Sequence, residues 1–250
     1  SIGAAHAPAI RLERAAHDLF GLVATGAGDE RPWLDHGRWG LKHPLGAAVR
    51  APEMTVRRYP FLPVEGESLH TIPVGPVHAG IIEPGHFRFT VNGEAIVRLE
   101  QRLGYVHKGI DSLMRGQSIE RALRVAGRTS GDSTVAYALA FSRAIEAAEG
   151  WEVPARAHHV RAIMAELERV ANHCGDIGAI CNDATFTIMH AHCGVLREEV
   201  LRAADACFGH RLMMDRIVPG GVAADLTAQG VAALRRLLDL FRRRFPPLVE

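Results

Sequence analysis

Two groups of polar residues in this sequence could do chemistry. The first is the hydroxyl-rich run Arg128–Ser133, which leads into an Ala-rich segment. Its hydroxyls and its carboxylate could cap the free N–H groups of a following helix, which is the common role of such residues. The second group is His78, Glu83 and His86, on a segment rich in Gly and Pro. Loops of this kind often carry function, and a hydrogen-bonded turn explains the group equally well.

A carboxylate further along the chain is a third candidate, because Asp183 follows another helical pattern and could cap it or face a cavity. Metal-type side chains also gather nearby: His173, Cys174, Cys181, His190, His192 and Cys193. They lack the paired spacing of a zinc site, and helix ends and buried free thiols explain them as well. No metal is therefore predicted there. The sequence has no P-loop, GxGxxG or HExxH motif.

The composition is that of a globular protein, with 48% hydrophobic and 23% charged residues. The formal charge of +1 gives no reason to expect a nucleic-acid partner. Four cysteines without a CxxC pair or a secretion signal favour a reduced, cytoplasmic setting. No apolar run reaches the length that spans a membrane. Because the chain starts without Met and stops soon after two prolines, we expect it to be a piece of a longer protein.

Residues 67–103 predict β structure. Asn92-Gly93 lies between two strand-like runs, which is typical of a type I′ hairpin whose two turn residues both need positive φ. With a two-residue loop, Phe89 would face Ile96 on the neighbouring strand.

Helical periodicity is found at the start of the chain and dominates after residue 103. The predicted helices cover residues 11–20, 134–148, 154–174, 195–208 and 226–245. Gly21 and Gly175 could end two of them, and Pro154 suits a first helical position. In the last helix an apolar stripe is expected on one side: Leu234, Leu237, Leu238, Phe241 and Phe245. Five arginines fall largely off this stripe, which indicates a solvated face, with a docking surface as the alternative.

Together these elements predict an α+β fold. A small antiparallel β-sheet lies beside a predominantly helical bundle, and an extended, loop-rich arm (21–66) precedes them. The arm is rich in Gly and Pro and shows little periodicity, so we expect it to wrap a partner surface.

Several motifs occur in the order found in one known family: Gly75–His78, Glu83–Arg88, Leu103–Gly109, Val153–Ala157, Glu166–Arg169 with Asn172-His173, and Pro219–Gly221. They resemble the large subunit shared by the quinone-reducing site of respiratory complex I and by membrane-bound nickel–iron hydrogenases of the formate-hydrogenlyase type. Upstream, Glu13-Arg14, His17–Gly21 and His43–Leu45 resemble the end of the small complex I subunit, which is fused to the large one in formate-hydrogenlyase proteins. This resemblance implies two domains, 1–66 and 67–250.

In the hydrogenase branch, the resemblance places an Arg-x-Cys-Gly-x-Cys motif at Arg128–Ser133, where two thiolates bind nickel and iron. Here Ser130 and Ser133 stand at both cysteine positions. A neutral hydroxyl is a hard, poor ligand where a soft thiolate is needed. We therefore expect no nickel–iron site and no cofactor in this chain.

In the complex I branch, the quinone head lies near a His, an Asp that orients this His, and a Tyr. The resemblance assigns the first two, as catalytic residues, to His86 and Asp183. No Tyr stands near Gly131, where the family has one, and Tyr137 follows one and a half helical turns later. Arg128 matches an Arg beside the terminal iron–sulfur cluster of the partner. The remaining candidate substrate-binding residues are His78, Glu83, Ser130 and Ser133.

The resemblance thus implies a subunit of a complex I-like, hydrogenase-related oxidoreductase on the cytoplasmic face of the plasma membrane. Its expected partners are an iron–sulfur small subunit, which carries the cluster, a membrane-anchor subunit and a quinone-like acceptor. His86 would donate a proton or a hydrogen bond, a role that suits an imidazole near neutral pH. Two alternatives stay open: a true nickel–iron hydrogenase large subunit, and a non-catalytic scaffold that holds the iron–sulfur subunit against the anchor.

Overall fold

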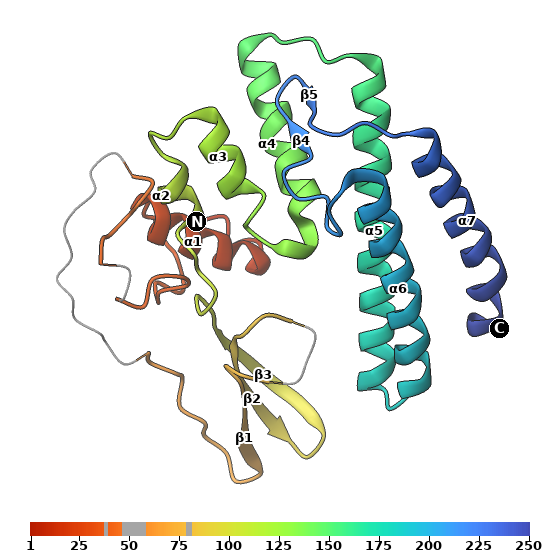
Figure 1. Ribbon diagram of the computed structural model, residues 1–250. Coiled ribbons are helices and arrows are strands. Elements are labelled where there is room, and N and C mark those ends of the chain that lie inside the picture. The colour runs from red at the N-terminus through yellow and green to blue at the C-terminus, as the bar shows by residue number, and fades with distance from the viewer. Residues whose placement is uncertain (38–39, 47–58, 79–81) are drawn as a thin grey trace. The chain divides into compact units, whose positions relative to one another are not determined.

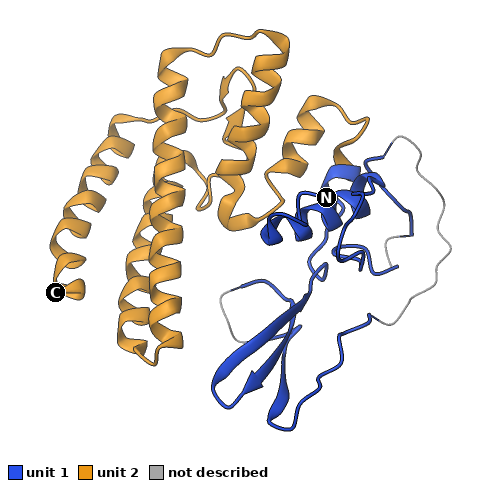
Figure 2. Ribbon diagram, turned by 180° about the vertical axis from the view of Figure 1, so that it is seen from behind, with its two compact units in different colours: residues 1–112 blue, residues 113–250 orange. Residues whose placement is uncertain are grey.

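The computed structural model describes residues 1–37, 40–46, 59–78 and 82–250. It divides the chain into two compact units, 1–112 and 113–250 (Figure 2). The predicted α+β class is confirmed, because helices predominate and the main sheet is small and antiparallel (Figure 1). The family-based division after residue 66 differs from this boundary and stays a prediction.

Unit 1 begins with helix α1 (Ile10–Phe20), which ends as predicted at Gly21 in left-handed backbone with φ 75°. Two buried charged residues one turn apart on α1, Arg14 and Asp18, hold the loop that follows. Arg14 donates to two backbone carbonyls of this loop at 2.6 and 2.8 Å. Asp18 accepts from three consecutive backbone N–H groups, residues 33–35. The loop is ordered by these side chains in place of secondary structure.

The described part of the predicted arm contains no helix, in agreement with its composition. The predicted sheet is confirmed as three antiparallel strands in the order β1 (Leu69–Val74), β2 (His86–Asn92) and β3 (Ala95–Arg102). The loop that joins β1 to β2 carries His78 and Glu83 of the second candidate group.

The β2–β3 turn differs from the prediction. Its two central residues are Gly93 and Glu94, since Asn92 pairs with Ala95 across the hairpin. Gly93 has φ 59°, and neither of its neighbours has positive φ. Positive φ at the first turn residue alone fits a type II′ turn, which places Gly at that position, so the predicted type I′ turn is wrong.

The strand register differs as well. Thr90 pairs with Arg98 while Val91 pairs with Ile96, so β3 contributes one extra residue at this point. Phe89 therefore faces a leucine of β3 and not Ile96, as the hairpin pattern had predicted.

Unit 2 is helical (Figure 1). Its helices are α3 (Ile119–Ala126), α4 (Thr134–Glu149), α5 (Ala155–Asp183), α6 (Thr187–Phe208), α7 (Ala228–Arg244) and α8 (Pro246–Val249), and α2 (Ile110–Met114) spans the boundary of the units. The antiparallel pair α5 and α6 forms its long axis. The apolar side of α5 faces the core, where Met164 is fully buried.

Helix α5 is longer than predicted, because it continues through Gly175 to Asp183. A Cβ atom at Gly178 would lie 3.0 Å from the Cβ atom of Cys193 on α6. Glycine at this position thus permits the two helices to approach closely. Helix α6 also begins earlier than predicted, at Thr187, while Pro154 directly precedes the first helical residue of α5.

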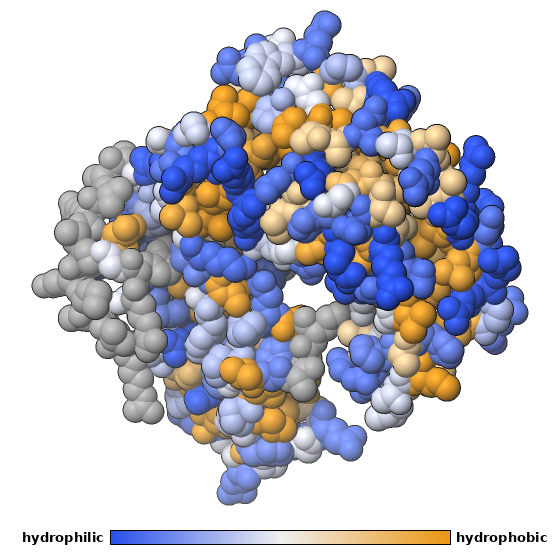
Figure 3. Space-filling model, in the orientation of Figure 1, coloured by the Kyte–Doolittle hydropathy of each residue, from blue (hydrophilic) through white to orange (hydrophobic). Residues whose placement is uncertain are grey.

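The last long helix, α7, buries Leu237 and packs Phe241 against the core. Leu238 is 54% exposed, so its predicted place on the apolar stripe is wrong. The arginines of α7 are exposed, as predicted, and Figure 3 shows a largely hydrophilic surface over this helix. A separate short helix, α8, begins at Pro246.

A buried ion pair fastens the small hairpin of β4 (Ile217–Val218) and β5 (Gly221–Val222) to α4 and α5. Arg161 and Glu146 are 1% and 7% exposed, and their Nη1 and Oε2 atoms lie 3.0 Å apart. Arg161 also donates to two carbonyl oxygens of the hairpin at 2.7 and 3.0 Å, and Glu146 accepts from the Gly220 N–H at 2.8 Å. The guanidinium lowers the pKa of Glu146 and keeps its carboxyl ionised.

Candidate functional site

In unit 1, His86 is the first residue of β2, directly after the β1–β2 loop that contains His78 and Glu83. Its ring is half-buried and packs edge-on against Phe61, with ring centroids 5.3 Å apart. The Nδ1 atom lies 3.1 Å from the carbonyl oxygen of Gly75. Since a carbonyl only accepts, Nδ1 carries the proton of this bond, and the neutral ring presents Nε2 as an acceptor. A protonated ring would instead present Nε2–H as a donor, which is the chemistry expected of His86.

The other two candidates in unit 1 are placed on the same loop, of which residues 79–81 lie outside the described part. The His78 ring packs edge-on against Phe87 with centroids 6.2 Å apart. Glu83 is exposed and forms no ion pair with a described residue. The structure thus brings His78, Glu83 and His86 to one end of the β1–β2 pair.

In unit 2, the candidate residues lie on the segment between α3 and α4. Arg128 forms a bidentate ion pair with Asp215, with N···O distances of 2.8 and 2.7 Å. Both side chains are about half exposed. The guanidinium lowers the pKa of Asp215, and the carboxylate raises the pKa of Arg128, so both stay charged.

The predicted hydroxyl cap of α4 does not form. Ser133 occupies the N-cap position but makes no capping hydrogen bond through its side chain, and Ser130 donates to the carboxylate of Asp132. The free N–H groups of Val135 and Ala136 are instead satisfied from α5.

This cap is the carboxylate of Glu168, which accepts from the two N–H groups at 2.7 and 2.9 Å. Glu168 is 9% exposed, and burial raises its pKa, with the nearby Asp132 carboxylate acting in the same direction. The two backbone hydrogen bonds oppose this shift. A side chain 33 residues away in sequence therefore fixes the start of α4, directly after the candidate loop.

Asp183 lies apart from this loop. It is the last residue of α5 and is exposed. Asn172, on the same helix, donates to the Asp132 carbonyl at 2.9 Å. Asp183 follows it by eleven residues, or about 16 Å along the helix axis. The predicted hydrogen bond from a ring N–H of His86 to the Asp183 carboxylate involves residues of different units and stays a prediction.

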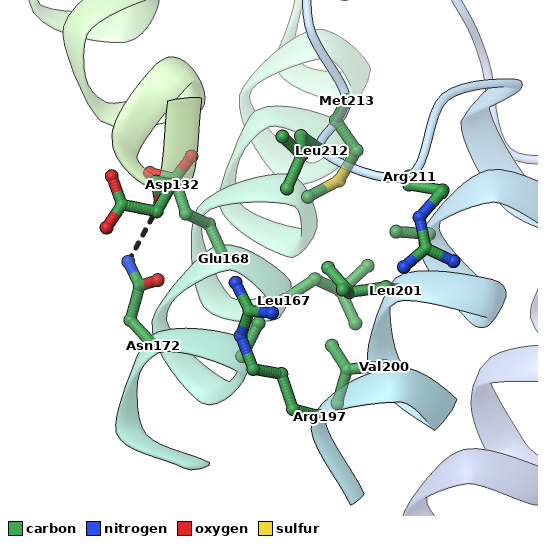
Figure 4. Close-up of a pocket in the computed structure, with 12 residues that line it drawn as sticks. Asp132, Leu167, Glu168, Asn172, Arg197, Val200, Leu201, Arg211, Leu212 and Met213 are labelled. Carbon is green, nitrogen blue, oxygen red and sulfur yellow. Dashed lines mark hydrogen bonds between the residues drawn. The ribbon is translucent and has the colours of Figure 1, made fainter. Parts of the chain in front are cut away.

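A small pocket lies beside the candidate loop of unit 2, with room for little more than a water molecule (Figure 4). Its lining includes Asp132, Leu167, Glu168, Asn172, Arg197 and Met213. Arg197 extends from α6 toward the α5 side, and it forms no ion pair with a described residue. The pocket combines an apolar floor with charged walls and is too small for a cofactor.

Two buried thiols, Cys174 and Cys193, lie between α5 and α6. Burial raises the pKa of both thiols, that of Cys174 to about 11. Within the described residues, no group of three or more His, Cys, Asp or Glu side chains is arranged to hold a metal ion.

The fold resembles a solved structure from the membrane-bound sulfane sulfur reductase, an archaeal respiratory membrane complex. The match has a TM-score of 0.69 at 19% identity and covers 75% of this chain and 50% of the other. No protein-family model matches the chain. Among the described residues, no helix is both long and apolar enough to cross a membrane.

Known relatives are more informative. Hydrogenase-4 component G of Escherichia coli is 32% identical over 246 residues, which cover 95% of this chain and 44% of the relative. Formate hydrogenlyase subunit 5 of Escherichia coli is 30% identical, over 95% of this chain and 43% of the relative. An NADH-quinone oxidoreductase subunit of Dehalococcoides mccartyi is 30% identical over 66% of this chain and 46% of the relative.

The chain therefore belongs to the large-subunit family shared by respiratory complex I and membrane-bound hydrogenases, as its motifs had predicted. The relatives in this family are subunits of oxidoreductase complexes. The chain spans less than half the length of the three relatives.

Sequence reasoning missed two side chains that organise the loop of unit 2. Glu168 lies within a motif that pointed to the family, but its role as a helix cap had no local signal. Asp215 follows Arg128 by 87 residues, and nothing in the sequence pairs the two.

Proposed function

We propose that this chain is part of a complex I-like, hydrogenase-related oxidoreductase that passes electrons from a partner's iron–sulfur cluster to a quinone-like acceptor. The iron–sulfur small subunit and a membrane anchor are its proposed partners, on the cytoplasmic face of the plasma membrane. The chain itself has no nickel–iron site in this proposal.

One observation carries the proposal beyond family membership. Hydrogenases carry two nickel-binding thiolates at this loop. This chain has Ser130 and Ser133 there, and the Ser130 hydroxyl donates a hydrogen bond to the Asp132 carboxylate. A loop that offers hydroxyl and guanidinium donors suits an oxygen-bearing acceptor better than a soft metal.

The proposed chemistry needs a proton source beside an electron source. His86 supplies the proton from the Nε2–H of its protonated ring, because its Nδ1–H is held by the Gly75 carbonyl and Nε2–H is left to donate to an acceptor oxygen. The proposed substrate-binding residues are Arg128, Ser130 and Ser133 in unit 2 and His78 and Glu83 in unit 1. For Asp183 to orient His86 in the assembled complex, its carboxylate would take the place of the Gly75 carbonyl as the acceptor of Nδ1–H.

The proposal is tested by acceptor reduction in the intact complex, purified with the full-length protein. His86→Ala should lower the turnover of a short-chain quinone at least tenfold, because general acid catalysis contributes at least about 10²-fold. His70→Ala is the matched control, since His70 is an exposed histidine on the neighbouring strand β1. Equal turnover in the two variants would remove the role assigned to His86.

The hydrogenase alternative is distinguished by metal analysis. Elemental analysis of the intact complex should give nickel far below one atom per large subunit. Stoichiometric nickel, together with hydrogen evolution, would establish the alternative and overturn the proposal.

A non-catalytic scaffold is the second candidate function. Two observations favour it: the guanidinium of Arg128 is already paired with the Asp215 carboxylate, and Asp183 is exposed at the end of a helix. If the chain is a scaffold, removing it should prevent assembly of the iron–sulfur subunit into the complex. His86→Ala should then leave the rate of acceptor reduction unchanged.

A further inference from the structure

Arg128 is held in one orientation from two sides. Its Nη1 atom donates to the Arg124 carbonyl at 2.9 Å, at the end of α3, and to one oxygen of Asp215 at 2.8 Å. Its Nη2 atom donates to the other oxygen of Asp215 at 2.7 Å. The end of the guanidinium is therefore occupied by a bidentate carboxylate.

Two N–H donors of Arg128 remain. A guanidinium has five N–H groups, and the three bonds to Arg124 and Asp215 take three of them. The Nε–H and the second Nη2–H lie on the same side edge of the planar group, where they form a second fork. No described residue accepts from this edge.

The loop that carries Asp215 is built to hold it. The ring nitrogen Nδ1 of His210 accepts from the backbone N–H groups of Leu212 and Met214 at 3.1 and 3.2 Å. Met213, which anchors the loop, is 3% exposed. Both Met213 and Asp215 have left-handed backbone, with φ 55° and 61°, although neither is glycine.

Left-handed backbone at two non-glycine residues is uncommon, and here the buried Met213 and the two hydrogen bonds to His210 hold it in place. Strain that is kept in this way is typical of sites where a side chain must be presented in a fixed position.

We infer that Asp215 is a positioning residue, which fixes Arg128 so that its Nε–Nη2 edge binds an anionic or carbonyl oxygen of the electron acceptor. This inference rests on the proposed function and names the chemistry of that same site. A quinone carbonyl fits it, and so does the phenolate oxygen that develops when a quinone is reduced. A planar fork binds such an oxygen with two parallel hydrogen bonds.

The test is the reduction of a short-chain quinone by the intact complex, with KM and kcat measured separately. Asp215→Ala and Asp215→Asn should each raise KM about fivefold, the effect of losing a well-placed but partly exposed ion pair, and change kcat less. Asn adopts left-handed backbone readily, so this second variant keeps the loop fold. Millimolar acetate, but not chloride, should restore the KM of Asp215→Ala by filling the vacated carboxylate position.

The matched control is Asp225→Ala, which removes the carboxylate of another exposed ion pair in unit 2, formed with Arg156. It should leave KM unchanged. Unchanged KM in both Asp215 variants, or an equal rise in Asp225→Ala, would overturn the positioning role while the proposed function stands. A wild-type complex that does not reduce the quinone would overturn both.

Discussion

Replacing Glu168 with Ala should destabilise unit 2 by about 3 kcal/mol, because this carboxylate completes the N-terminus of α4. The substitution removes two hydrogen bonds, of 2.7 Å to Val135 and 2.9 Å to Ala136. Val135 is 1% exposed, so its unpaired N–H costs about 2 kcal/mol. Ala136 is exposed, so water partly replaces the carboxylate there, and the cost is about 1 kcal/mol.

Urea unfolding followed by far-UV circular dichroism measures this loss. Glu166→Ala is the matched control, because Glu166 lies on the same helix but is 64% exposed and pairs only with Arg169. Hydrogen exchange should also accelerate in the first turn of α4 in the Glu168 variant alone. A stability loss within about 0.5 kcal/mol of that of the control would refute the assignment of Glu168 as the cap.

The same residue predicts a pH dependence. Burial raises the pKa of Glu168 in the folded state above its ordinary value of 4.5. Between these two pKa values the folded state binds more protons than the unfolded state, so stability falls as pH rises through this interval. The unfolding free energy of the wild type minus that of Glu168→Gln should therefore decrease as pH rises from 4.5. A difference that grows with pH would contradict the raised pKa.

Three further predictions concern the helical core. Glu146→Ala should lower the free energy of unfolding in urea by about 4 kcal/mol, because it leaves the guanidinium of Arg161 buried without its carboxylate partner. The double variant Glu146→Leu/Arg161→Met should recover most of this loss. Gly178→Leu should lower the free energy of unfolding by about 2 kcal/mol or more, because a Cβ atom at this position already lies 3.0 Å from α6. Its control is Gly194→Ala, where a Cβ atom would have nothing within 4 Å, and this variant should raise the stability by up to about 1 kcal/mol. The Cys174 thiol, with a pKa of about 11, should react with iodoacetamide at pH 8 far more slowly than glutathione, as measured by mass spectrometry, and labelling at equal rates would contradict its burial.

The existence of the five longest helices was predictable, while the short helices α2, α3 and α8 and several helix ends were not. Helical periodicity predicted α5, but Gly175 suggested an end that the structure does not have. Nearby, Gly178 permits a close contact with Cys193 of α6. The sequence around Gly175 and Gly178 does not show that another helix packs there. A glycine that ends a helix and a glycine that permits packing have the same local pattern.

The same limit applies to the hairpin and to the cap of α4. Asn92-Gly93 correctly predicted a two-residue turn, but the turn lies one position later, and an extra residue in β3 shifts the register beyond it. Ser130 and Ser133 were reasonable caps by residue type, and yet Glu168 provides the cap from 33 residues away. Long-range side chains decide these points, and local propensity does not contain them.

The candidate site was predictable as a set of residues and not as a geometry. The motifs identified the family, and the structure shows how His86 and Arg128 are held within their own units. The partner of Arg128 had no signal in the sequence, because Asp215 lies on a loop whose left-handed backbone no pattern predicts.

The most direct test of the account follows the electron itself. The iron–sulfur clusters of the intact complex are reduced, and the spin signal of the terminal cluster is followed by electron paramagnetic resonance after a short-chain quinone is added. The account predicts rapid loss of this signal in the wild type and slow loss in His86→Ala. A signal that is indifferent to quinone in both proteins would contradict an acceptor site on this chain.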